Sequence, residues 1–317
     1  MQATTTHDLI LHHYPMSPFA EKARLMLGLK DLAWKSVHIP AVMPKPDVVA
    51  LTGGYRKTPL LQVGADIYCD TALIADVIEH RVAEPPLYPP MARGLSRAVA
   101  QWADNSLFWA SMGYTLSPKG AAALFANRPP DETQAFASDR AAMRQNMTLL
   151  RPADATSAYR SYLRRLASML DDQPYLLGEM PCIADLAAYH PLWFTRTLNP
   201  GLSSILDATP DVTEWMDRIA AIGHGHTQPF SSTEALGIAH AATPEPIGAD
   251  EAFQDDHGIA LGSRVSIAAE AFGTEASEGL LRAATRTRYT IERQDPRAGT
   301  VHVHFPRVGY VLREVRA

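Results

Sequence analysis

The chain has 317 residues, enough for two or three domains, and 46% of them are hydrophobic, which is ample for packed cores. The net charge of −5 argues against a nucleic-acid-binding surface, and no apolar run reaches the length of a membrane span. Only two cysteines are present, so a disulfide framework is excluded and a reducing compartment is expected. The polar N-terminus, MQATTTHD, lacks the basic and apolar segments of a signal peptide, and we therefore expect a cytoplasmic protein.

The first predicted elements are a buried strand at residues 9–11 and a helix at residues 20–29. Ser17 is placed to cap this helix, because its hydroxyl can accept a hydrogen bond from an unpaired backbone N–H. Pro18 falls at the first helical position, where a missing N–H costs nothing. The Ser17 hydroxyl is thus expected at the positive end of a helix, where an anion such as a thiolate is stabilised. Taken alone, the pattern is more often that of a simple helix cap.

A hairpin followed by a helix is predicted in the stretch GYRKTPLLQVGADIYCDTALIADVIEH, residues 54–80. Residues 60–63 form one strand, residues 64–66 a turn and residues 67–68 the returning strand. The helix begins near Thr71 and has one apolar face, made by Leu73, Ile74, Val77 and Ile78. Between this stretch and the first helix, residues 34–39 read as a strand and residues 47–51 as a short helix.

This order of elements resembles the thioredoxin-like domain of soluble glutathione transferases. The motif SPFAEKAR, residues 17–24, is most similar to the signature of the omega class, with Ser17 where that class has a cysteine. The zeta and theta classes are similar in placing a serine there. The resemblance implies glutathione as co-substrate, and a serine in place of cysteine implies that thiol–disulfide exchange is absent.

The resemblance also implies roles for individual residues. Ser17 would donate a hydrogen bond to the glutathione sulfur and stabilise the thiolate, and Tyr14 is the second candidate for that contact. Ser17 as a covalent nucleophile is a weaker alternative, because no adjacent base is evident. The remaining contacts with glutathione are expected from Phe19, Lys57, Thr58, Pro59, Asp70 and Thr71.

Three of these contacts have plain alternatives. Thr58-Pro59 resembles the pair with a cis peptide bond whose backbone binds the cysteinyl part of glutathione, although an X-Pro bond is ordinarily trans. Asp70 and Thr71 would hold the γ-glutamyl group, but Asp70 stands where the family usually has Glu or Gln and could simply cap the helix. Lys57 matches a position that contacts the tripeptide, and an exposed lysine is also ordinary on any surface.

Beyond the proline-dense connection at residues 83–90 the pattern becomes helical, with one long segment at 95–116 and others at 159–169, 183–189 and 210–225. This resembles the all-α domain of the transferases, in which Asp185 would cap a buried helix from its first turn. The aromatic residues Phe108, Trp109 and Tyr114 lie on the helix that usually walls the electrophile pocket. An aromatic stripe at this spacing is more often part of a core.

The last quarter of the chain changes character after a linker at residues 243–246. Alternating residues predict short antiparallel strands at about 265–269, 289–291, 301–305 and 309–315. His302 and His304 share one strand face and could begin a metal site. Because no third ligand is evident at a useful spacing, we expect a solvated strand face and no metal.

Together these predictions describe a multidomain α/β + α + β protein. Residues 1–83 form a thioredoxin-like glutathione-binding domain, residues 84–243 an all-α domain, and residues 244–317 a small antiparallel β accessory domain. The expected function is attack of the glutathione thiolate on a small hydrophobic electrophile. The alternatives are a glutathione-dependent lyase, isomerase or dehalogenase, or a non-catalytic glutathione-binding protein. The family's habit implies a homodimer, and neither nucleic acid nor membrane is expected as a partner.

Overall fold

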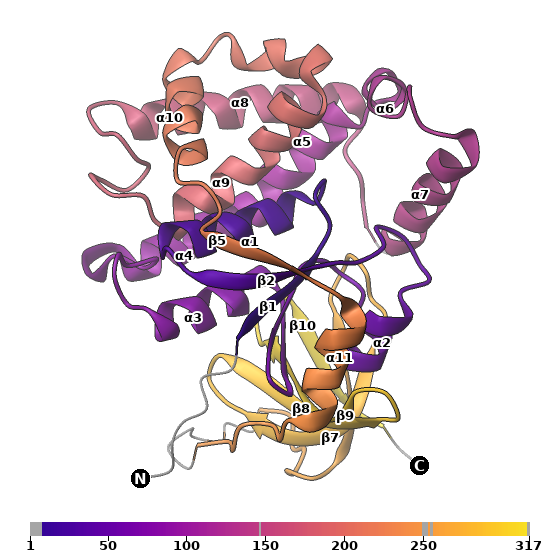
Figure 1. Cartoon of the computed structure of the whole chain (residues 1–317). Helices are drawn as coiled ribbons and strands as arrows, with labels where there is room; N and C mark the ends of the chain where they lie inside the picture. The colour runs from indigo at the N-terminus through magenta and orange to yellow at the C-terminus, as the bar shows by residue number, and fades with distance from the viewer. Residues whose placement is uncertain (1–7, 146, 249–252, 254–255, 316–317) are drawn as a thin grey trace.

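The computed structural model describes residues 8–145, 147–248, 253 and 256–315. A helical layer lies on one side of the molecule (Figure 1). A single sheet runs from the centre of the molecule to the end opposite these helices. The N-terminal elements are β1 (Leu9–His13), α1 (Pro18–Leu29), β2 (Ala33–His38), α2 (Pro46–Thr52), β3 (Leu60–Val63), β4 (Asp66–Cys69) and α3 (Thr71–Arg81). These match the predicted order of a thioredoxin-like domain.

The helical layer follows the proline-dense connection, as expected. Its α-helices are α4 (Arg93–Trp102), α5 (Phe108–Thr115), α6 (Pro118–Leu124), α7 (Pro130–Met143), α8 (Pro152–Leu170), α9 (Ile183–Trp193) and α10 (Pro210–Ala220). Short 3-10 turns are η1 (Pro90–Ala92) and η4 (Pro200–Leu206), and π-helical turns are η2 (Ala103–Leu107) and η3 (Phe194–Leu198). The segment predicted as one helix at 95–116 is therefore interrupted by a π turn, a feature that sequence periodicity does not reveal. None of the described helices is long and apolar enough to cross a membrane.

The C-terminal elements are β5 (His226–Phe230), α11 (Ser232–Ala241), β6 (Arg264–Ala269), β7 (Ser277–Ala284), β8 (Arg288–Asp295), β9 (Gly299–Pro306) and β10 (Tyr310–Glu314). The last five strands form an antiparallel sheet, as predicted, although the sequence analysis missed β7. These five strands are continuous with the N-terminal strands, because β9 pairs in parallel with β4. At the other end of the sheet, β5 pairs in parallel with β2. The result is one ten-stranded sheet in the order β10-β6-β7-β8-β9-β4-β3-β1-β2-β5.

Two hydrophobic cores lie on opposite faces of this sheet, and the alternation of β1 separates them. Leu9 and Leu11 face the helical layer, where they join residues such as Trp215, while Ile10 faces the opposite way. The second core contains residues of β6–β10 together with α2 and α11, and Phe305 lies within it. The C-terminal strands thus share a core with the thioredoxin-like strands.

The expectation that His302 and His304 lie on a solvated strand face is wrong. His302 is 7% exposed and His304 is 2% exposed. The physical reason is that β9 is an interior strand, flanked by β4 on one side and β8 on the other. Sequence alternation identifies the face that the two imidazoles share, but it does not say what covers that face.

The shared core generates a prediction for stability. Phe305 is 1% exposed and contacts the rings of Tyr55 and Tyr310. Phe305→Ala should lower the free energy of unfolding by about 3–5 kcal/mol, as expected for a large cavity in a core. All five tryptophans lie within residues 34–215, so their fluorescence mainly reports the first two thirds of the chain, although Trp109 also contacts Phe272 in the β6–β7 connection.

If the sheet unfolds as one unit, the tryptophan transition of Phe305→Ala shifts together with the far-UV circular dichroism. Val308→Ala serves as the control, because Val308 lies in the same segment but is 68% exposed and should leave both transitions in place. A tryptophan transition that stays at its wild-type midpoint in Phe305→Ala would show that the C-terminal strands unfold independently.

Candidate functional site

Three predicted site segments meet at one end of the sheet because of strand register. In the antiparallel pairing of β1 with β3, His12 lies opposite Leu60, and in that of β3 with β4, Leu60 lies opposite Cys69. The chain segments that follow β1, precede β3 and follow β4 therefore emerge side by side. These are residues 14–17, 58–59 and 70–71, so backbone pairing brings all three predicted glutathione segments to one edge.

Ser17 is the N-cap of α1, as the sequence predicts, and Pro18 occupies the first position of the helix. The Oγ atom of Ser17 accepts a hydrogen bond of 3.2 Å from the backbone N–H of Ala20. Within the described residues the Ser17 hydroxyl donates to no acceptor, so its hydrogen is available to a ligand. The side chain is 2% exposed, which places the hydroxyl in a desolvated setting at the positive end of the helix.

The peptide bond between Thr58 and Pro59 is cis, as predicted. Beside it lies Lys45, a residue that the sequence analysis missed. The Nζ atom of Lys45 donates to Thr58 Oγ1 at 3.3 Å and to the Arg56 carbonyl at 3.1 Å, and among the described residues it forms no ion pair. Burial, with a smaller contribution from Arg140, lowers the pKa of Lys45 to about 8.

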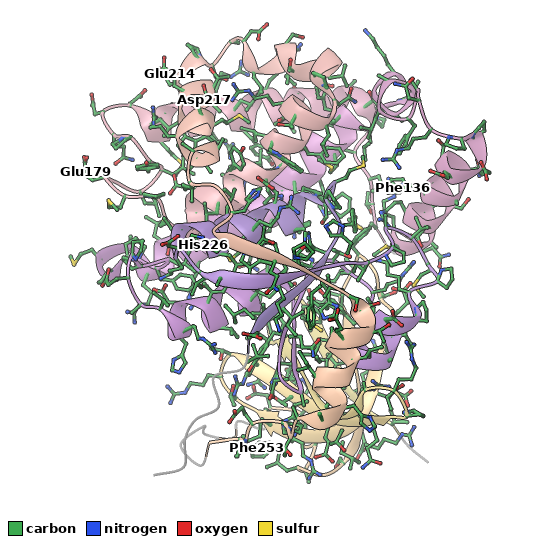
Figure 2. All side chains as sticks on the ribbon, viewed as in Figure 1. Phe136, Glu179, Glu214, Asp217, His226 and Phe253 are labelled. Atoms are coloured by element: carbon green, nitrogen blue, oxygen red, sulfur yellow. The ribbon has the colours of Figure 1, made fainter. Side chains whose placement is uncertain are left out.

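Tyr14 lies on the other side of this lysine, whose Nζ atom is 5.8 Å from the centre of the Tyr14 ring. The hydroxyl of Tyr14 accepts a hydrogen bond of 3.2 Å from Arg140 Nη2, which comes from α7. Arg140 also lies over the ring of Phe136 on the same helix. Phe136 is labelled on α7 in Figure 2. The helical layer thus supplies a second cation at this edge, and no sequence pattern links α7 to the first strand.

Asp70 and Thr71 begin α3, and both already have protein partners. Asp70 is the N-cap, with Oδ1 accepting from the Ala72 N–H at 3.0 Å, and its Oδ2 accepts from the Tyr310 hydroxyl at 3.0 Å. Thr71 Oγ1 accepts from Lys22 Nζ at 3.2 Å. Asp70 therefore caps α3, and its other carboxylate oxygen is held by a side chain from the last strand.

Lys57 lies against Tyr310, the first residue of β10. Its Nζ atom is 4.7 Å from the centre of the Tyr310 ring and 5.5 Å from that of Tyr55, which are cation–π distances. Burial lowers the pKa of Lys57, and the nearby carboxylate of Asp70 opposes that shift. The expectation of an ordinary exposed lysine therefore does not describe this residue.

The connection between β6 and β7 covers the same edge. Glu275 pairs with Arg56 at 2.7 Å, and the backbone N–H of Gly273 donates to the Met143 carbonyl at 2.9 Å. The ring of Phe272 contacts Trp109 at a centroid distance of 5.2 Å. Sequence analysis missed these contacts because the residues involved are more than a hundred positions apart.

Phe19 points into the boundary between α1 and the helical layer. Its ring centroid is 4.7 Å from that of Phe108 and 4.6 Å from that of His190. His190 in turn bonds Asp104, which pairs with Lys22 of α1. Phe19 therefore packs α1 against α5 and α9, next to the capped end of α1 that carries Ser17.

Comparison with known families agrees with this geometry. The profile described as "Glutathione S-transferase, N-terminal domain" matches residues 11–86, and the profile described as "Glutathione S-transferase, C-terminal domain" matches residues 130–218. Comparison with curated proteins found no match.

Solved structures extend the comparison. The crystal structure of a GST-like protein from Pseudomonas syringae is 41% identical, covers 98% of this chain and 100% of its own, and has a TM-score of 0.82. A glutathione S-transferase from Rhodospirillum rubrum is 19% identical, covers 67% of this chain and 88% of its own, and has a TM-score of 0.52. The second likeness concerns the fold alone and leaves a third of this chain unmatched, whereas the Pseudomonas syringae protein matches nearly all of it. On the two family profiles and this full-length likeness, the chain belongs to the glutathione S-transferase superfamily.

Proposed function

We propose that this protein is a glutathione transferase in which Ser17 stabilises the glutathione thiolate for attack on a small hydrophobic electrophile. The observation that carries the proposal is the convergence of the Ser17, Thr58-Pro59 and Asp70-Thr71 segments at one edge of the sheet in a chain of this superfamily. The proposal includes glutathione as co-substrate, a cytoplasmic setting, and the family's homodimer. The domain limits at residues 83 and 243 are part of it as well.

The chemistry is a matter of stabilising an anion. The glutathione thiol has a free pKa near that of cysteine, about 8.5, and the thiolate is the reactive form. A charge-assisted hydrogen bond contributes about 1.5–3 kcal/mol, and about 1.4 kcal/mol corresponds to one pKa unit. A hydrogen bond donated by Ser17 would therefore lower the thiol pKa by about one to two units, with the N-terminus of α1 adding to the effect.

The charges around the site support an assignment for the rest of the tripeptide. Lys45 is a buried cation that forms no ion pair among the described residues, so an anionic ligand would supply its missing counter-charge. We assign it to the glycyl carboxylate. Asp70 and Thr71 would hold the γ-glutamyl group, and the hydroxyl of Tyr310 fixes the Asp70 carboxylate for that contact.

The electrophile would lie between the capped end of α1 and the helical layer. Aromatic rings from both parts of the chain gather there, including those of Phe108, Trp109 and Phe272. Rings of this kind favour a small hydrophobic or aromatic molecule.

A second candidate function is non-catalytic binding of glutathione. It is favoured by the contacts that the last strands make over the site, since Tyr310 holds Asp70 and the β6–β7 connection contacts Arg56. Formation of thiolate on binding separates the two functions, because a protein that only binds glutathione has no need to ionise it.

The first prediction for this function concerns Ser17→Ala. The pKa of bound glutathione should rise by about one to two units, and turnover with a generic electrophile near neutral pH should fall about ten- to a hundredfold. Raising the pH should recover part of the loss, because the thiol then ionises without help. Thiolate absorbance measured against pH, together with initial rates, tests this directly.

The control is Ser231→Ala. Ser231 caps α11 as Ser17 caps α1, with its side chain accepting from the Glu234 N–H at 3.2 Å, so both variants lose one helix cap worth about 0.5–2 kcal/mol. Only Ser17→Ala should change the titration. An unchanged titration in Ser17→Ala, with a shifted one in Tyr14→Phe, would transfer the role to Tyr14.

The variant Ser17→Cys tests the position of the sulfur independently of rates. A cysteine at a helix N-terminus has a lowered pKa and reacts readily with disulfides. Incubation with oxidised glutathione should therefore give a mixed disulfide at residue 17, detected as added mass. If the variant stays unmodified, the sulfur of glutathione does not lie next to residue 17 and the assigned site is wrong.

A further prediction uses the lowered pKa of Lys45. Lys45 is charged below its pKa of about 8 and loses its proton as the pH rises through that value. S-methylglutathione has no ionisable thiol, so its affinity should be constant at neutral pH and fall severalfold above pH ~8 as Lys45 is neutralised. Lys45→Met should bind about ten- to a hundredfold more weakly at neutral pH, and calorimetry measures both effects.

The amino group of the ligand also titrates, but it does so equally in both proteins, so the difference between the two curves isolates Lys45. Lys119→Met removes an exposed lysine on α6 and should bind as wild type does. Parallel pH curves for wild type and Lys45→Met would rule out the carboxylate contact, and absence of heat in wild type at millimolar ligand would rule out the glutathione site itself.

A further inference from the structure

A cluster of two imidazoles and one carboxylate lies at the boundary between the N-terminal strands and the C-terminal strands. Asp66 is the first residue of β4, and in the parallel pairing with β9 it lies opposite His302. His304 lies two residues further along β9 and therefore on the same face of the sheet. All three residues are buried, and one ligand atom from each lies within 4.8 Å of the others. Asp66 supplies the third potential ligand, which the spacing of residues in the sequence did not reveal.

One atom of this cluster has no hydrogen-bond partner. His304 Nε2 bonds Asp66 Oδ1 at 2.8 Å, whereas His302 Nδ1 lies 3.7 Å from the same oxygen, beyond hydrogen-bond distance. Among the described residues, His302 Nδ1 has no other hydrogen-bond partner, although the side chain is more than nine-tenths buried. A buried polar atom without a partner is costly, and an ion bound between this nitrogen and the Asp66 carboxylate would satisfy it.

The groups around the three residues are already arranged as an outer shell. Thr290 Oγ1 lies 2.9 Å from His304 Nδ1, and Glu292 Oε2 lies 3.7 Å from His302 Nε2. The second oxygen of Asp66 accepts a hydrogen bond of 2.8 Å from the backbone N–H of Glu245. In metal sites, the ring nitrogen that does not bind the ion faces such a partner, which fixes the tautomer and the orientation of the ring.

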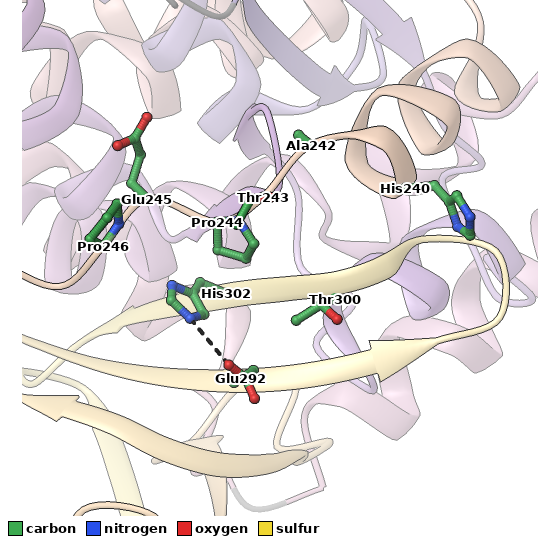
Figure 3. A pocket seen from close by; sticks show the side chains of 9 residues that line it. All are labelled: His240, Ala242, Thr243, Pro244, Glu245, Pro246, Glu292, Thr300 and His302. Carbon is green, nitrogen blue, oxygen red and sulfur yellow. Dashed lines mark ion pairs between the residues drawn. The ribbon is translucent and has the colours of Figure 1, made fainter. Parts of the chain in front are cut away.

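We propose that Asp66, His302 and His304 bind a divalent transition-metal ion of the zinc class through Asp66 Oδ1, His302 Nδ1 and His304 Nε2. Two imidazoles and one carboxylate are a donor set that such ions take up, and three protein ligands leave one tetrahedral position for water. His302 and Glu292 also line a cavity of about 410 Å³ that can supply this water (Figure 3). The ion would join β9 and the linker at residues 243–246 to β4, and this role is independent of the glutathione chemistry.

The test uses the full chain, stripped of metal with a chelator and titrated with Zn²⁺ by competition calorimetry. Wild type should bind one Zn²⁺ per chain, and its thermal unfolding midpoint should rise with the ion. His302→Gln removes a ligand that makes no hydrogen bond through Nδ1, and it should weaken Zn²⁺ binding about a hundredfold or more and abolish the thermal shift. Glu292→Gln, which alters the outer shell, should weaken binding about tenfold.

The matched control is His240→Gln. His240 lines the same cavity but lies away from His302 and is not part of the cluster (Figure 3), so its replacement should leave Zn²⁺ affinity unchanged. Wild-type protein that binds no Zn²⁺ at about 10 μM, or His302→Gln that binds it as wild type does, would overturn the proposal. X-ray absorption at the zinc edge of the wild-type complex tests the ligand set without any variant, and fewer than two imidazole ligands would overturn it as well.

Discussion

Parallel pairing of β9 with β4 is the interaction on which the rest of this structure depends. Residues 66–68 of the N-terminal hairpin pair with residues 302–304, and β4 is thereby an interior strand. An unpaired β4 would expose a row of backbone N–H and C=O groups, which proteins avoid. The pairing joins five C-terminal strands to the four thioredoxin-like strands and gives both groups one core.

The same pairing determines what surrounds the edge of the sheet that carries the proposed glutathione site. Once β9 lies beside β4, β10 and the β6–β7 connection extend over the loops that carry Thr58 and Asp70. Tyr310 and the β6–β7 connection lie close to Lys57, and burial is the leading reason that both Lys45 and Lys57 have a lowered pKa. Electrostatic interactions are stronger in such a setting than at an open surface. A hydroxyl and a few cations can therefore have a larger effect on a bound anion than they would have in solvent.

Strand β4 also links the two sites that the structure suggests. Asp66, at its start, belongs to the cluster with His302 and His304, and Asp70, directly after its end, accepts a hydrogen bond from Tyr310. Four residues of extended chain span about 13 Å, so the two carboxylates lie at opposite ends of one short rigid element.

The sequence by itself determined the local elements of this protein. Apolar runs and alternation predicted most of the strands, though not β5 or β7, and Ser17 and Pro18 predicted the start of α1. The order of motifs pointed to the superfamily. Each of these signals depends on neighbours within a few residues. The cis bond before Pro59 was also expected, from its place in that motif.

Which strand edges meet is visible only in the folded structure. The backbone N–H and C=O groups are the same in every strand, so they do not specify which strands pair. The roles of β5 and β9 in one continuous sheet, the burial of His302 and His304, and the approach of Tyr310 to Asp70 follow from that pairing. Lys45 and Arg140 reach the site from the loop before α2 and from α7. Alternation placed the two histidines on one face but could not show that Asp66, more than two hundred residues away, would lie beside them.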